Sequence, residues 1–190
     1  MRTVKEPDVR KREILEGAIA VFAKKGYDRT TISDIAKELN ISQGLCYRYF
    51  PSKEAIYDAA LEKYAEIIAR ENHRYTNMDL PIRDLVDQIT SDTSYRKAEK
   101  KDKSLYQLFH SKDSSRLHDE LSLRVSKKVL PIVRERLRMA KETGEITIDD
   151  PDGAAIAGVY TWAGVFMTDG LTDKERLRII RSTWYTLLKL

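Results

Sequence analysis

The chain has 190 residues, 42% of them hydrophobic and 34% charged, with 34 Lys and Arg against 30 Asp and Glu. This composition is typical of a globular protein and excludes a fibrous or largely disordered chain, and a single cysteine excludes an internal disulfide. The charged start continues into an amphipathic pattern, and the longest uncharged run, residues 153–168, is shorter than the ~20 residues of a membrane span. We therefore expect a cytoplasmic protein without a secretory signal or membrane segment.

Apolar residues recur at three- and four-residue steps along almost the whole chain, which predicts an all-α fold. The first helix is expected from Asp8 to Lys25, with Gly26 just beyond its end. Its buried face would consist of Ile14, Ala18, Val21 and Phe22.

Two short helices joined by a tight turn are predicted next. The first begins after Thr31, where Thr31 and Asp34 form a capping pair, and it buries one apolar face. Asn40 tolerates the left-handed backbone of a sharp helix end, and Ser42 can cap the following helix. The predicted apolar face consists of Ile32, Ile35, Ala36 and Leu39. This pattern predicts a helix-turn-helix, and hence DNA as the partner.

The second of these helices is expected to present its outer face to DNA. Spacing places Ile41, Cys46 and Phe50 inward, where Cys46 is interpreted as an inert core thiol rather than a redox switch. The residues expected to face outward are Gln43, Gly44, Leu45, Tyr47 and Tyr49.

Each outward residue has an expected role on the duplex. Gln43 can pair with adenine in the major groove, Leu45 can contact a thymine methyl group, and Gly44 allows close approach of the backbone. Tyr47, Tyr49 and Lys53 are expected to contact phosphates. The helix starts after Thr31 and Ser42 offer backbone amides to further phosphates.

These residues resemble the N-terminal pattern of the TetR-type (TetR/AcrR) bacterial transcriptional regulators. The resemblance covers roughly a third of the chain, and it implies a helix-turn-helix domain followed by a helical body that forms a dimer and binds a small-molecule effector. The matching positions are Phe22, Lys25, Gly26, Thr30, Thr31, Ile35, Ala36, Ser42, Gly44, Tyr47, Tyr49, Phe50, Ser52, Lys53 and Glu54.

The distribution of charge supports the same interpretation. Residues 1–53 hold 11 Lys and Arg against 7 Asp and Glu, whereas residues 54–190 hold 23 of each. All of the excess positive charge thus lies in the predicted DNA-binding part, and affinity for DNA should fall steeply with salt. The basic stretch at Arg10–Arg12, with Arg2 and Lys5, is either a solvated terminus or an arm that touches DNA.

We predict two domains, with the DNA-binding domain at residues 1–52 and an effector-binding and dimerisation domain at 53–190. A long helix from Lys53 to about Tyr75 would join them without a linker, with Ile56, Ala60, Tyr64, Ile67 and Ile68 inward. Further helices are expected near 82–97, 101–111, 115–143, 151–168 and 173–189, and Pro131 should kink the longest.

The last two predicted helices have the pattern of an association surface. Small residues in 151–168 permit close helix approach, and 173–189 carries an apolar seam. Both stripes fit an intramolecular core equally well, and the TetR resemblance favours a homodimer. The expected interface residues are Ala157, Tyr160, Gly164, Leu177, Ile180, Trp184 and Leu187.

No catalytic constellation is visible in the sequence. His73, His110 and His118 lie in separate segments without metal-ligand spacing, and there is no phosphate-binding glycine loop or nucleophile motif. Asp149, Asp150 and Asp152 around Pro151 fit a helix start. We therefore expect no enzyme, no cofactor and no metal.

The expected function is a DNA-binding transcriptional regulator: a repressor that a small-molecule effector releases from a palindromic operator. The resemblance implies an effector pocket, which aromatic side chains could line, although such residues more often belong to the core. The alternative is a helical DNA-binding or adaptor protein without ligand control. The candidate pocket residues are Tyr95, Tyr106, Phe109, Trp162 and Phe166.

Overall fold

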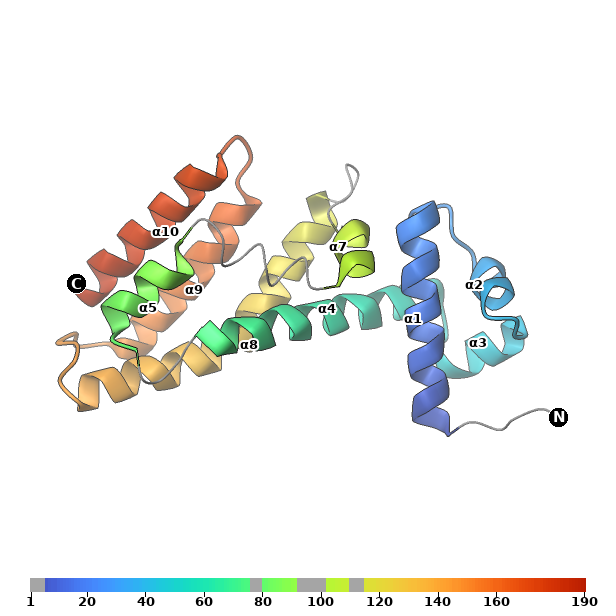
Figure 1. Ribbon diagram of the computed structural model, residues 1–190, viewed down its shortest axis with the longest axis horizontal. Coiled ribbons are helices and arrows are strands. Elements are labelled where there is room, and N and C mark those ends of the chain that lie inside the picture. The colour runs from blue at the N-terminus through green and yellow to red at the C-terminus, as the bar shows by residue number, and fades with distance from the viewer. Residues whose placement is uncertain (1–5, 76–79, 92–101, 110–114) are drawn as a thin grey trace. The chain divides into compact units, whose positions relative to one another are not determined.

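The computed structural model describes residues 6–75, 80–91, 102–109 and 115–190, and over these ranges the chain forms α-helices and no strand (Figure 1). The predicted all-α fold is confirmed. None of the helices in these ranges is both long and apolar enough to cross a membrane. The helices are α1 (Pro7–Lys25), α2 (Ile32–Glu38), α3 (Gln43–Tyr49), α4 (Lys53–Tyr75), α5 (Ile82–Ile89), α7 (Lys103–Phe109), α8 (Ser115–Glu142), α9 (Pro151–Met167) and α10 (Asp173–Leu188).

Most predicted helix ends agree with the structure within two residues, and α5 is the exception. The helix predicted over 82–97 stops at Ile89. The Thr90 hydroxyl donates to the carbonyl oxygen of Val86 at 2.6 Å, and the Ser91 hydroxyl donates to that of Gln88 at 2.8 Å. Hydroxyl side chains that bond to nearby carbonyls favour a helix end, so the prediction was wrong there, while residues 92–97 lie outside the described ranges.

The chain forms two compact units, and the boundary between them falls within α4 rather than at residue 52. The first unit comprises Met1–Tyr64 and Asp102–Ser114, and the second comprises Ala65–Lys101 and Ser115–Leu190. Helix α7 belongs to the first unit because Phe109 packs on Tyr57 and stacks on Tyr64 of α4.

The core of the first unit confirms the predicted apolar faces of α1 and α2, except that Leu39 is half-buried. In α4 the predicted inward residues are buried, with Ile67 half-buried. The fully buried side chains include Ile14, Phe22, Ile35, Cys46, Ile56, Leu61, Tyr64, Leu105 and Phe109.

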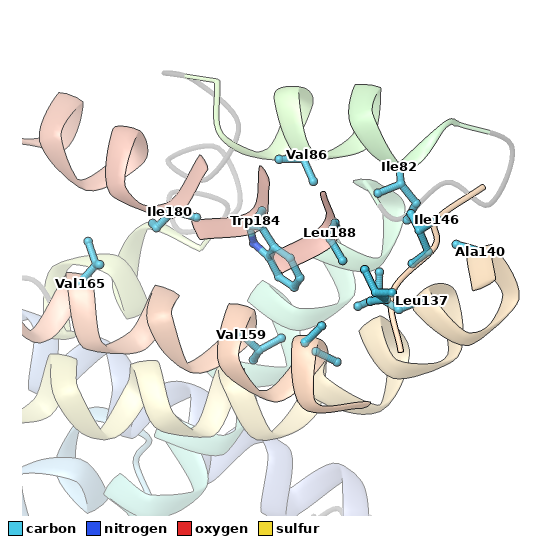
Figure 2. Close-up of a cluster of buried hydrophobic side chains, with 13 residues drawn as sticks. Ile82, Val86, Leu137, Ala140, Ile146, Val159, Val165, Ile180, Trp184 and Leu188 are labelled. Carbon is cyan, nitrogen blue, oxygen red and sulfur yellow. The ribbon is translucent and has the colours of Figure 1, made fainter. Parts of the chain in front are cut away.

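The core of the second unit is an apolar cluster between α5, α8, α9 and α10 (Figure 2). Trp184 and Leu188 of α10 meet Val159 of α9 in this cluster, and Ile82 and Val86 of α5 cover it. Helices α9 and α10 approach closely at Gly158, where an added Cβ would lie 2.2 Å from the Trp184 ring. The indole therefore occupies the space that a larger residue at position 158 would need.

An ion pair between the buried Arg136 and the more exposed Glu145 fixes the start of α5. Arg136 is 6% exposed and donates from Nη2 to the Leu80 carbonyl and to Glu145 Oε2, both at 2.8 Å. Glu145 in turn accepts a hydrogen bond from the backbone amide of Ile82. These contacts tie the segment after α8 to the first turn of α5, since helix-start amides need acceptors.

Candidate nucleic-acid interface

The start of α2 is built as the sequence predicts. The Thr31 hydroxyl accepts from the Asp34 amide at 3.2 Å, and Asp34 Oδ2 accepts from the Thr31 amide at 3.0 Å. Lys25 at the end of α1 donates to Asp34 Oδ1 at 2.7 Å. The Lys25 ammonium, followed by the Thr31 amide and hydroxyl, lowers the pKa of Asp34 well below its usual range. The carboxylate thus joins two helices and caps one of them.

The turn between α2 and α3 depends on Asn40. Its φ of 51° lies in the left-handed region, as predicted. The Ile41 amide donates to the Ala36 carbonyl at 2.9 Å, and the Asn40 amide donates to the Lys37 carbonyl at 3.1 Å. This pair of bonds is a Schellman motif, which ends a helix sharply and fixes the direction of the next segment.

Helix α3 is capped and anchored at its inner side. The Ser42 hydroxyl accepts from the Leu45 amide at 3.2 Å. Cys46 and Phe50 are buried as predicted, and Ile41 is half-buried. Burial raises the pKa of the Cys46 thiol, so it stays protonated at neutral pH, in agreement with an inert core residue.

The outer face of α3 is formed by Gln43, Gly44, Tyr47 and Arg48, all exposed. Tyr47 is 51% exposed, which is unusual for an aromatic side chain. Leu45 and Tyr49, also predicted to face outward, are half-buried at the edges of this face. Arg48 was missed in the sequence interpretation, although its position four residues after Gly44 places it on the same side of the helix.

Among the residues that the structure describes, no neighbour of Gly44 requires a glycine at this position. A Cβ added there would meet nothing within 4 Å, and its φ is not positive. A glycine in the first turn of a helix without such a reason lowers helix stability relative to alanine. The open space leaves room for close approach of another molecule to this face.

Lys53, predicted to contact a phosphate, also has partners within the chain. Its ammonium donates to the carbonyl oxygens of Tyr27 at 3.1 Å and Asp28 at 3.4 Å, and lies 4.2 Å from the centroid of the Tyr27 ring. Tyr27 also donates to Glu54 at 3.3 Å, and burial together with the Glu54 carboxylate raises the pKa of Tyr27. Lys53 thus fastens the start of α4 to the segment between α1 and α2.

The residues predicted for a dimer interface separate into two groups. The first group is buried in the core of the second unit and consists of Leu177, Ile180 and Trp184. These residues therefore fit the alternative interpretation, in which the apolar stripe packs within the same chain. Ala157 and Gly164 are exposed on α9, and Tyr160 and Leu187 are half-buried. Only the second group offers surface to a partner chain.

The predicted effector-pocket residues that the structure describes belong to two different units. Phe109 is fully buried against Tyr57 and Tyr64 in the first unit, where Tyr106 is half-buried. Trp162 and Phe166 stack in the second unit with ring centroids 5.7 Å apart. Residues lying outside the described ranges, or whose side chains are not described, are Tyr95, Arg96–Lys101, His73, His110 and His118.

No metal-binding group of three or more His, Cys, Asp or Glu side chains occurs among the residues that the structure describes. Asp150 instead caps α9 by accepting from the Gly153 amide at 2.8 Å, as the helix-start interpretation of the acidic cluster predicted. Asp152 forms an ion pair with Arg138, which lowers the pKa of that carboxyl.

Comparison with known proteins places the helix-turn-helix among bacterial regulators. The profile of bacterial regulatory proteins of the tetR family matches residues 14–60. The HTH-type transcriptional regulator YuxN of Bacillus subtilis is 51% identical over 51 residues, which cover 27% of this chain and 18% of YuxN. The biofilm operon icaADBC negative transcriptional regulator IcaR of Staphylococcus aureus is 44% identical over 52 residues, which cover 27% of this chain and 28% of IcaR. The matched segment thus spans less than a third of either relative.

Solved structures extend the likeness of the fold over nearly the whole chain. Salmonella enterica GusR superposes with a TM-score of 0.65 at 22% identity, covering 98% of this chain and 99% of GusR. A transcriptional regulator from Cytophaga hutchinsonii superposes with a TM-score of 0.63 at 20% identity, covering 94% and 96%. At this level of identity the agreement concerns the fold.

Proposed function

We propose that the chain is a TetR-type transcriptional regulator that binds a palindromic operator as a homodimer and represses transcription until a small-molecule effector releases it. The family and the relatives named above are transcriptional regulators, in agreement with the prediction that the chain is not an enzyme. The observation that carries the proposal is the outer face of α3, exposed and centred on a glycine that its own chain does not need.

Recognition of DNA follows from the chemistry of that face. A helix of this size fits the major groove, where Gln43 can pair with the N6 and N7 atoms of adenine. Gly44 lets the helix backbone come close to the base edges, while Tyr47 and the capped start of α2 at Thr31 lie at exposed positions that suit phosphate contacts. Bacterial DNA lies in the cytoplasm, where we expect the protein to act.

Dimerisation is supported by an exposed apolar face on α9. Ile156 is 41% exposed and Met167 is 39% exposed, and Tyr160 and Gly164 lie between them at helical spacing. An added Cβ at Gly164 would meet nothing within 4 Å, so the described part of the chain gives no packing reason for a glycine in the last turn of α9. A second copy of the chain packed closely against α9 would explain the small residue at position 164. The two-fold axis of such a dimer would match an inverted repeat in the DNA.

Negative control is proposed because IcaR is a negative transcriptional regulator. A regulator of this kind needs an effector that prefers the state unable to bind the operator. To move the operator-competent population from about 99% to about 1%, that preference must reach about 5.5 kcal/mol. Trp162 and Phe166, half-buried and stacked in the second unit, remain the candidate contacts for such a ligand.

Release of DNA is proposed to involve α7, because that helix packs within the DNA-binding unit. Phe109 of α7 lies 5.6 Å from Tyr57, and Tyr57 lies 4.8 Å from Tyr27, measured between ring centroids. Tyr27 in turn holds Lys53 at the start of α4. A ligand that displaced α7 would disturb this row of rings and hence the support of the helix-turn-helix.

Selection from a random-sequence duplex library tests the proposal. The purified chain is incubated with the library at moderate salt, and the retained duplexes are sequenced. Recovery of an inverted repeat, with half-sites about one helical turn apart or a multiple of it, is the expected result. Retention without any common sequence, or no retention, would overturn the proposal in favour of an architectural DNA binder or an adaptor.

A further inference from the structure

Arg48 is an exposed cation on the DNA-facing side of α3 whose guanidinium forms no hydrogen bond or ion pair with any other described residue. Other cations of the same unit are already engaged: Arg10 pairs with Glu13 at 2.9 Å, and Arg29 donates to the Lys25 carbonyl at 3.0 Å. The Arg48 guanidinium, with all its donors, is therefore available to an external acceptor.

The position of Arg48 on α3 directs it toward the part of the helix that meets base edges. Arg48 follows Gly44 by four residues, so the two lie about 40° apart around the helix axis. Side chains of an α-helix lean toward its N-terminus, and a residue covers the surface about one turn before its own Cα. For Arg48 that surface is the turn of Gly44, where the structure leaves open space.

We propose that Arg48 reads a guanine in each half-site of the operator, donating two hydrogen bonds to its N7 and O6 atoms. This inference rests on the proposed function and adds a base identity to it. The planar fork of an arginine matches the two acceptors of guanine in the major groove, and no other base presents that pair. With Gln43 in the first turn of the same helix, the half-site would hold a guanine close to an adenine.

Two experiments test this role. Library selection is repeated with Arg48→Ala, Arg48→Lys and the control Lys37→Ala, which removes an exposed cation of α2. The wild-type chain and Lys37→Ala should both select a guanine at one fixed position of each half-site. Arg48→Ala should lose that preference by about 10- to 100-fold, and Arg48→Lys should lose much of it because an ammonium lacks the planar fork.

The second experiment removes one acceptor from the DNA. Replacing that guanine by 7-deazaguanine deletes N7 without changing base pairing, and it should weaken binding of the wild-type chain at least several-fold but leave binding of Arg48→Ala unchanged. Since Arg48 is exposed, the variants should keep the wild-type thermal midpoint.

The outcomes separate the inference from the proposed function. If the wild-type chain selects an inverted repeat but Arg48→Ala selects the same bases with uniformly weaker affinity, Arg48 contacts phosphate and the inference is overturned while the proposed function stands. If the deaza substitution affects both proteins alike, the inference is likewise overturned. If the wild-type chain selects no motif, the proposed function and this inference fall together.

Discussion

Gly44 is the residue at which folding and the proposed DNA contact would make opposite demands. Its surroundings are open in the folded chain, so alanine fits without a clash, and alanine is the better helix former. We predict that Gly44→Ala keeps or slightly raises the thermal midpoint but weakens operator binding at least tenfold, since the methyl group would separate α3 from the groove. Thermal unfolding and equilibrium binding measured on one preparation check both parts. Unchanged affinity would show that DNA does not approach α3 at this position.

Lys53 combines a predicted phosphate contact with an observed structural role. Loss of its ammonium in Lys53→Ala removes the contacts to the carbonyl oxygens of Tyr27 and Asp28 and the cation–π contact to the Tyr27 ring. We expect the free energy of unfolding to fall by about 1 kcal/mol. We also expect the affinity for DNA to fall by the same factor whatever the DNA sequence. Denaturant unfolding and binding to several duplexes measure these effects.

The control for Lys53→Ala is Lys24→Ala, which removes an exposed lysine in the last turn of α1. A comparable loss of stability in both variants would show that general charge, and not the contacts of Lys53, is responsible.

Sequence reasoning at the residue scale succeeded where the signal is local. The caps at Thr31 and Ser42 and the left-handed Asn40 follow from side-chain chemistry within three or four residues, and the structure confirms them. Lys53 lies 26 positions after Tyr27 and 25 after Asp28, the two residues whose carbonyl oxygens it contacts. No local pattern therefore predicts these contacts. Arg48 was missed because the family pattern does not fix that position.

Among the elements, α2 depends on a carboxylate with a lowered pKa. The folded pKa of Asp34 lies below its ordinary value of 3.8, so the unfolded chain binds the proton more readily. The stabilisation from Asp34 is therefore present above about pH 4 and is lost as the pH falls toward the folded pKa. Denaturant unfolding between pH 6 and pH 2.5 should show a smaller decline for Asp34→Asn than for the wild-type chain. Equal declines would mean that Asp34 contributes nothing to the acid sensitivity.

Two glycines of α9 distinguish internal packing from association. At Gly158 an added methyl group would overlap the Trp184 ring, and we predict that Gly158→Ala destabilises the second unit by about 1–3 kcal/mol. At Gly164 the space is open, so Gly164→Ala should not destabilise the chain but should weaken the proposed dimer. Tryptophan fluorescence follows unfolding of the second unit, and sedimentation measures the dimer. Destabilisation by Gly164→Ala would contradict the exposed position of Gly164.

Helix existence was predictable from periodicity, whereas the partner of each apolar face was not. The seam of α10 at Leu177, Ile180 and Trp184 has the spacing of either a core or an interface. Only the structure shows that α9 and α5 of the same chain cover it. The premature end of α5 arises from the hydroxyls of Thr90 and Ser91, which compete for carbonyls in a segment whose apolar spacing continues.

For the whole molecule, the central question is whether the chain discriminates between DNA sequences. The uneven distribution of charge favours salt-dependent attraction to any duplex, since the excess of Lys and Arg lies within residues 1–53. In the proposed function, sequence preference comes from the outer face of α3, presented twice by a two-fold dimer.

The most direct test is an equilibrium titration of the selected inverted repeat and of a scrambled duplex of the same base composition, at several salt concentrations. The logarithm of each affinity should fall linearly with the logarithm of salt, and two chains should bind each inverted repeat. We predict that the inverted repeat binds about 1,000-fold more tightly than the scrambled duplex, or better. Equal affinity for both duplexes at every salt concentration would contradict sequence-specific regulation and leave only charge-driven binding.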